Sequence, residues 1–249
     1  MPFFKPSARF YFGGGESLKK LLREISAKYS VNEEDSIIYA ADNMILISKI
    51  FGFLKEEKFA HYANKFFAGD TLHSSIVWRI HILSWAINHT KNLKGDFAEF
   101  GCYDGLVAQF LIEYNELDET SKNFFLFDIF DDPPTEKGEK HSPELYDEVS
   151  KRLKNYSCAK IIKGLLPDSF DEKKYSDFSF VHMDLNDASS ELSVLEKIFE
   201  KVVSGGIIIL DDYGHQGYEE QYKKEKEFFA QKNHSIVELP TGQGLVIKI

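Results

Sequence analysis

One stretch, the eleven residues GDFAEFGCYDG from Gly95 to Gly105, constrains the fold more than any other part of the sequence. Its apolar residues up to Phe100 predict a short strand, and apolar residues after Gly105 recur at helical spacing, so a glycine turn joins a strand to a helix. Gly101 and Gly105 let the backbone pass close to a ligand, toward which the helix presents its N–H groups. The pattern is not the dinucleotide fingerprint G-x-G-x-x-G, because that fingerprint needs a third glycine. A ligand-binding turn and a plain tight turn fit equally well.

From Gly95 onward, apolar strand-like runs alternate with helical stretches. Near-continuous apolar strands in such an alternation predict a parallel sheet covered by helices on both faces. The predicted strands are 97–100, 124–127, 160–162, 178–183 and 207–210, with a closing pair at 235–239 and 245–249. The predicted helices are 106–114, 143–153, 191–202 and 217–231.

The chain before this alternation predicts a helical cap. We expect an N-terminal extension of residues 1–73 ahead of a main domain of residues 74–249. After a loop-like start, an amphipathic helix is predicted at 18–29. A second helix is predicted from Asn32, with one apolar face made by Ile37, Ala41, Met44, Ile47 and Phe51. A third is predicted at about 75–88, and the N-terminal helices are a candidate contact for a homo-oligomer.

Composition excludes several partners. The net charge of −10 and the lack of a dense Lys/Arg patch disfavour nucleic acid, because phosphate binding needs a basic surface. Cys102 and Cys158 form neither a disulfide framework nor a metal-ligand spacing, which indicates a reduced, cytoplasmic setting. We find no signal peptide and no apolar run of 18 residues, so no membrane partner is expected.

The carboxyl ends of the predicted strands are where ligands bind in open parallel sheets. Asp128 ends the second strand and is placed to accept hydrogen bonds from ribose hydroxyls, although a helix cap or a loop acid is also consistent with it. Gly164 at the end of the third strand would let the chain run along an adenine, or it is a turn residue. Asp184 follows the fourth strand.

The fifth strand adds two acids, Asp211 and Asp212, which would lie beside Asp184 on the neighbouring strand. Three like charges in one small volume repel one another unless a cation binds between them. Carboxylate oxygens select a hard ion such as Mg²⁺, with Ca²⁺ or Mn²⁺ as alternatives. Acids at strand ends also serve as caps, so a structural role stays open.

The strand-end motifs resemble those of class I S-adenosylmethionine (SAM)-dependent methyltransferases. The closer similarity is to the macrocin O-methyltransferase family, from roughly Ser74 to the C-terminus. The motifs that carry it are GDFAEFG at 95–101, FDIF at 127–130, HMD at 182–184 and GGIIILDDY at 205–213.

This resemblance implies a Rossmann-like, seven-stranded, mostly parallel sheet with helices on both faces. It also implies SAM-dependent O-methylation of a hydroxyl on a small molecule such as a sugar, assisted by a divalent metal. The implied metal ligands are Asp184, Asp211 and Asp212, and Asp184 is also assigned to catalysis. The implied cofactor-binding residues are Glu99, Gly101, Cys102, Tyr103, Gly105, Asp128, Ile129, Gly164 and Leu165. Asn186 and Ala188 depart from the family pattern, which tends to have Asp and Tyr at these positions.

Two histidines are candidates for the base that takes the hydroxyl proton, and a third is a candidate for a supporting role. His141 ends a polar segment, residues 131–141, that we expect to form a lid, and it is the preferred base. His215 follows the acidic pair, where nearby negative charge would make it a poorer base. His182 shares a strand face with Asp184 and is a candidate to support the metal ligands.

Two other functions remain as alternatives. A nucleotide-dependent oxidoreductase would use a similar sheet, but the missing third glycine and the closing strand pair count against it. A SAM-binding module without catalytic activity is consistent with the departures at Asn186 and Ala188.

Overall fold

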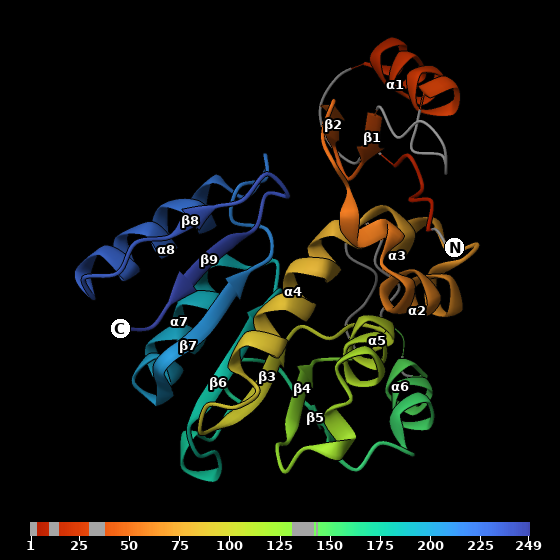
Figure 1. The fold of residues 1–249 in the computed structure, drawn as a ribbon. Helices are drawn as coiled ribbons and strands as arrows, with labels where there is room; N and C mark the ends of the chain where they lie inside the picture. The colour runs from red at the N-terminus through yellow and green to blue at the C-terminus, as the bar shows by residue number, and fades with distance from the viewer. Residues whose placement is uncertain (1–3, 10–14, 30–37, 131–141, 143) are drawn as a thin grey trace. The chain divides into compact units, whose positions relative to one another are not determined.

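The computed structural model describes residues 4–9, 15–29, 38–130, 142 and 144–249 of the chain (Figure 1). They form two compact units, residues 1–82 and 83–249, and the boundary lies within helix α4 (Val77–Thr90). The segment predicted to be a lid, residues 131–141, lies outside the described residues.

The second unit is built on a seven-stranded sheet with the strand order β5-β4-β3-β6-β7-β9-β8. Five strands are parallel, and β9 and β8 add to the β7 edge as antiparallel neighbours. The strands are β3 (Asp96–Phe100), β4 (Phe124–Asp128), β5 (Ala159–Lys163), β6 (Phe178–Met183), β7 (Val202–Leu210), β8 (Val237–Glu238) and β9 (Gly244–Ile247). The predicted sheet, including its closing strand pair, is confirmed.

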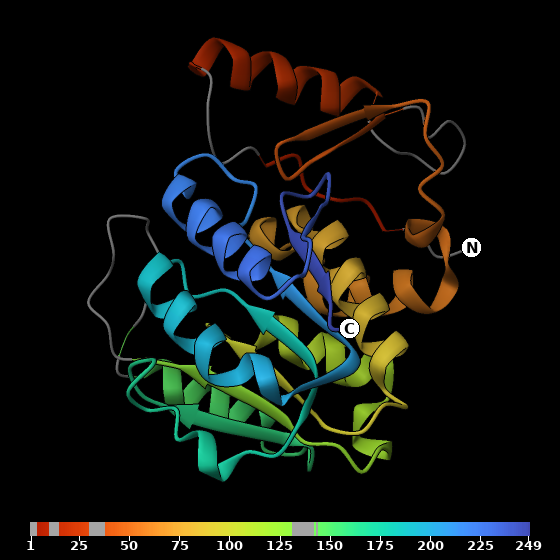
Figure 2. The same cartoon turned by 90° about the vertical axis from the view of Figure 1, so that its left-hand side faces the viewer.

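Helices cover both faces of this sheet: α7 and α8 lie on one face, and α5 and α6 on the other (Figures 1 and 2). The long helices are α5 (Leu106–Asn115), α6 (Leu145–Leu153), α7 (Ala188–Ile198) and α8 (Glu219–Gln231). Single 3-10 turns are η2 (Leu117–Glu119), η3 (Glu172–Lys174) and η4 (Phe199–Lys201). The predicted helix 191–202 therefore ends too late, because β7 already begins at Val202. None of the helices in the described ranges is long and apolar enough to cross a membrane.

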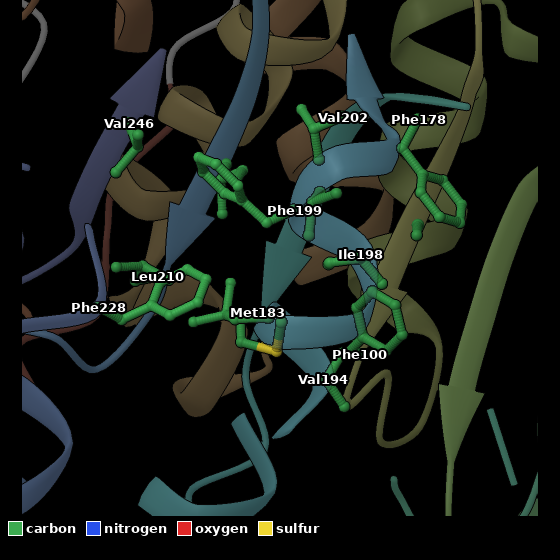
Figure 3. Close-up of a cluster of buried hydrophobic side chains, with 14 of the residues drawn as sticks. Phe100, Phe178, Met183, Val194, Ile198, Phe199, Val202, Leu210, Phe228 and Val246 are labelled. Carbon is green, nitrogen blue, oxygen red and sulfur yellow. The ribbon is translucent and has the colours of Figure 1, made fainter. Parts of the chain in front are cut away.

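A cluster of buried hydrophobic residues lies between the sheet and the α7–α8 layer (Figure 3). Met183 and Leu210 project from β6 and β7, and Ile198 of α7 and Phe228 of α8 pack against the same cluster. Burial of one such side chain contributes about 1.5–3 kcal/mol. This packing fixes the last residues of β6 and β7, after which the acids predicted to bind metal follow.

The first unit contains a β-hairpin where the second N-terminal helix was predicted, so that prediction is wrong. Strands β1 (Ile38–Ala41) and β2 (Met44–Ile47) pair in antiparallel register. They are joined by Asp42 and Asn43 with φ of 50° and 58°, the conformation of a two-residue hairpin turn. Short apolar runs fit a strand or a helix, and the turn decides between them.

An ion pair anchors this hairpin turn to the start of α4. Asp42 is 1% exposed, and its two oxygens accept hydrogen bonds from Nε and Nη2 of Arg79 at 2.7 and 2.8 Å. The remaining elements of this unit are α1 (Glu16–Tyr29), η1 (Gly52–Lys55), α2 (Glu57–Phe67) and α3 (Thr71–Ser75). The predicted helices at 18–29 and 75–88 are present as α1 and α4, whereas α2 lies in a segment that had no prediction.

Candidate active site

The glycine turn after β3 lies against the chain that follows β6. Gly101 has φ of 97°, and a Cβ atom at this position would overlap the carbonyl oxygen of Asp184. The amide of Asp184 in turn donates to the carbonyl of Phe100 at 2.8 Å. The absence of a side chain at Gly101 therefore brings the predicted cofactor turn and the predicted metal ligand Asp184 together.

Asp128 holds the other side of the same turn. Its oxygen Oδ2 accepts a hydrogen bond from the backbone amide of Tyr103 at 2.7 Å, and Oδ1 accepts one from the amide of Phe130 at 2.9 Å. Tyr103 takes a positive φ of 45° to make this contact. Each carboxylate oxygen has two lone pairs, so these bonds leave capacity for further donors. Ribose binding by Asp128 stays a prediction.

Glu99, near the end of β3, has one oxygen engaged and one unused. Oε1 lies 2.8 Å from Nδ1 of His182, whereas Oε2 is buried with no hydrogen-bond partner in the part of the chain described. A buried carboxylate oxygen without a donor is costly, so a ligand that donates there would be favoured. The amino group of SAM has the right chemistry for this position.

The other residues predicted to bind the cofactor include a thiol and several apolar or small side chains near the ends of β3, β4 and β5. Leu165, after β5, is 60% exposed, and Gly164 donates its amide to the carbonyl of Asp128 at 3.0 Å. Ile129 is half-buried. Burial, together with the charges of Asp128 and Glu99, raises the pKa of the Cys102 thiol well above its ordinary value. A thiol with a raised pKa stays protonated near neutral pH, which argues against a role for Cys102 as a nucleophile.

Two of the three predicted acids, Asp184 after β6 and Asp211 after β7, come close together at the adjacent strand ends. One ligand atom each from Asp184, Asp211 and His182 lies within 4.8 Å of the others. Burial and the charges of Asp211 and Asp212 raise the pKa of Asp184 well above its ordinary value. A divalent cation would relieve this repulsion, so the donor set fits a metal ion.

Asp212 is less central than predicted. Its carboxylate is buried but is not part of the group of three that meets within 4.8 Å. Its charge contributes to the raised pKa of Asp184, Glu191 and Glu225, so it lies in the same acidic environment. A role for Asp212 as a metal ligand stays a prediction.

Four residues support the acids of this cluster. His182 was predicted from the sequence in this role, and Asn186 was noted only as a departure from the family pattern. Gln243, before β9, donates from Nε2 to Oδ1 of Asp211 at 2.8 Å. Asn186 donates from Nδ2 to Oδ1 of Asp184 at 3.3 Å, and its own amide oxygen accepts from the hydroxyl of Tyr218. No sequence pattern indicates these contacts for Gln243 or Tyr218, because both residues reach the site from other segments of the chain.

The two remaining histidine predictions have different outcomes. His141 lies outside the described residues, so its role as the base stays a prediction. The Nε2 atom of His215 is buried and lies against Gly242, where a Cβ atom would overlap the ring. This position turns the imidazole of His215 toward the β8–β9 turn and weakens its case as the base.

Comparison with known proteins assigns the chain to an enzyme family. The sequence model of the macrocin O-methyltransferases (TylF) matches residues 78–235, well over half of the chain. The chain belongs to this family. It is therefore a SAM-dependent O-methyltransferase with a small molecule as its methyl acceptor, and the oxidoreductase alternative is set aside. No curated protein sequence matches the chain significantly.

Several solved methyltransferase structures have the same fold as this chain. The apo structure of CalS11, a TDP-rhamnose 3'-O-methyltransferase of calicheamicin biosynthesis, matches with a TM-score of 0.60 at 10% identity, covering 95% of this chain and 96% of CalS11. The O-methyltransferase NovP matches with a TM-score of 0.58 at 16% identity, covering 69% and 80%. PaMTH1 of Podospora anserina, solved with S-adenosylhomocysteine (SAH), matches with 0.55 at 13%, covering 97% and 99%. The predicted class I methyltransferase fold is confirmed.

Proposed function

We propose that this methyltransferase methylates a hydroxyl group of a sugar or a related natural product, with the assistance of a divalent cation such as Mg²⁺. The observation that supports the proposal is the convergence of Asp184, Asp211 and His182 within 4.8 Å, beside a buried oxygen of Glu99 that has no partner among the described residues. The sugar is suggested by CalS11, whose name gives TDP-rhamnose as its substrate.

The cofactor side of the site follows from the turn after β3. Oε2 of Glu99 would accept a hydrogen bond from the amino group of SAM, and Asp128 would accept from the ribose. Gly164 and Leu165 would lie along the adenine. SAM supplies an electrophilic methyl group, and these residues hold it in one orientation toward the acid cluster.

The acceptor side follows from the acids after β6 and β7. Asp184 and Asp211, with Asp212 as the third predicted ligand, would hold the cation. When bound, the cation supplies positive charge that lowers the pKa of a neighbouring hydroxyl group. The acids position the acceptor near the methyl group, and His141 is our proposed base for the proton that the hydroxyl loses.

The experiment is isothermal titration calorimetry with SAH and MgCl₂ as separate probes. We expect the wild-type enzyme to bind both. Asp184→Asn should lose most of the Mg²⁺ affinity and keep its SAH affinity, because the carboxylate serves the cation and not the cofactor. Asp187→Asn is the matched control: Asp187 is exposed and caps α7 by accepting from the amide of Ser190 at 2.8 Å.

Two results would contradict the proposal. Unchanged Mg²⁺ binding in Asp184→Asn would show that the cation does not bind at this acid cluster. Binding of NAD with no binding of SAH would overturn the cofactor assignment altogether.

A further inference from the structure

A line of three polar side chains crosses three neighbouring strands at the carboxyl edge of the sheet. Glu99 of β3 and His182 of β6 are direct partners in the strand register, and His182 pairs with Ile209 of β7. Asp211 follows Ile209 by two residues and so extends from the same side of the sheet. The line joins Glu99, on the cofactor side, to Asp211, on the metal side.

Each end of the imidazole ring meets one of these acids. Nδ1 of His182 lies 2.8 Å from Oε1 of Glu99, and Nε2 lies 3.4 Å from Oδ1 of Asp211. All three residues are buried, with exposed fractions of 2% for Glu99, 4% for His182 and 7% for Asp211. Buried side chains held on rigid strands have few alternative rotamers, so the ring fixes the orientation of both acids.

The contact with His182 determines which oxygen of Glu99 remains available to a ligand. Because Oε1 is engaged by His182, Glu99 presents Oε2, which has no partner among the described residues, to an incoming donor. At the other end, Asp211 is held by His182 and by Gln243, which donates at 2.8 Å. Both contacts are made to Oδ1 of Asp211, so together they fix the orientation of this carboxylate.

We infer that His182 is a shared positioning residue, which orients Glu99 toward the amino group of the cofactor and Asp211 toward the divalent cation through one imidazole ring. This inference rests on the proposed function, in which both ligands bind here. In this inference His182 contacts neither the cofactor nor the cation directly. The ring instead supports a carboxylate in each site, as residues behind metal ligands commonly do.

The test measures SAH and MgCl₂ affinities of two folded variants by calorimetry. His182→Asn shortens the side chain so that it cannot span both acids, and His182→Phe keeps a ring without donors. We expect both variants to bind Mg²⁺ about 10- to 100-fold more weakly, the usual effect of losing such a support. We expect SAH binding to weaken by about tenfold, the usual value of one hydrogen bond to a charged group.

Gln243→Leu is the matched control, because Gln243 donates a hydrogen bond to Asp211 and, among the described residues, makes none with Glu99 or the cofactor turn. It should weaken Mg²⁺ binding and leave SAH binding unchanged. A second readout excludes a general structural effect. In Glu99→Gln, the further change His182→Phe should weaken SAH binding less than it does alone, since the contact is already altered.

Several outcomes would overturn the inference. If both affinities are unchanged in the folded variants, His182 positions nothing. If Mg²⁺ binding is abolished while SAH binding is intact, His182 is a metal ligand and not a shared support. If only SAH binding falls, the contact with Asp211 has no function. A wild-type enzyme that binds neither probe would refute the proposed function as well, which separates the two failures.

Discussion

Two buried glutamates between α7 and α8 allow a prediction whose size follows from the structure. Glu191 and Glu225 are 0% and 1% exposed, and burial together with the charge of Glu225 raises the pKa of Glu191 well above its ordinary value. Burial, with a smaller contribution from the charge of Asp212, raises the pKa of Glu225 from 4.5 to about 7. Oε1 of Glu191 accepts from the amide of Leu185 at 2.8 Å, so the pair supports the loop that carries Asp184.

The sign of the pH dependence follows from the raised pKa. At pH below 4.5, Glu225 is protonated in both the folded and the unfolded chain, and its contribution to stability is fully present. As the pH rises toward 7, the unfolded chain releases the proton while the folded state retains it, so stability is lost. One pKa unit corresponds to about 1.4 kcal/mol, so the total loss is at most about 3 kcal/mol.

Glu225→Gln removes this titration and keeps an amide that can donate to Glu191. We expect the variant to resemble the wild type at pH 5 and to have a higher free energy of unfolding at pH 8, by up to about 3 kcal/mol. The assay is urea denaturation followed by circular dichroism, in the presence of a chelator so that metal binding does not contribute. Glu227→Gln, an exposed position on the same helix, is the control and should differ from the wild type by less than about 0.5 kcal/mol at either pH.

A wild-type-like pH slope in Glu225→Gln would refute the reasoning, because it would mean that Glu225 does not hold a proton in the folded state. An equal loss of stability at both pH values would have the same consequence, since it would indicate damaged packing and no titration effect.

Two further predictions concern the active site. Gly101→Ala places a Cβ atom against the carbonyl oxygen of Asp184 in a backbone with φ of 97°, so it should cost at least about 2 kcal/mol in urea denaturation and abolish SAH binding; normal SAH affinity would show that the turn can move. His141→Ala should lower single-turnover methyl transfer by about 100-fold or more with SAH binding nearly unchanged, whereas His215→Ala should have the smaller effect. The reverse order would assign the base to His215.

The sequence predicted the sheet and the place of the acids because both depend on local patterns. Apolar runs separated by helical stretches define the strands, and the carboxyl ends of adjacent parallel strands meet at one edge. Asp184 and Asp211 come together for this reason alone. The hairpin at Asp42 and Asn43 was missed because four-residue apolar runs on either side of a turn also fit one face of a helix.

The contacts that orient the acids were less predictable, because they depend on the register between strands and on distant segments. The pairing of Glu99 with His182 follows from how β3 aligns with β6, which periodicity within one strand does not determine. Gln243 reaches Asp211 from the turn before β9, 32 residues along the chain. Such contacts follow from the three-dimensional arrangement only.

The departure from the family pattern at Asn186 acquires a physical meaning from its two contacts. The carboxylate of Asp184 accepts hydrogen bonds, so the amide of Asn186 must turn Nδ2 toward it, and its oxygen is then available to the hydroxyl of Tyr218. Both polar atoms of the amide are thus committed to orienting neighbours, and an amide is in any case too weak a base to accept the hydroxyl proton. An aspartate at this position could take that proton, whereas Asn186 cannot. The proton must therefore go to another group of the chain or to solvent, and the comparison of His141 with His215 tests the two histidines that are candidates for that group.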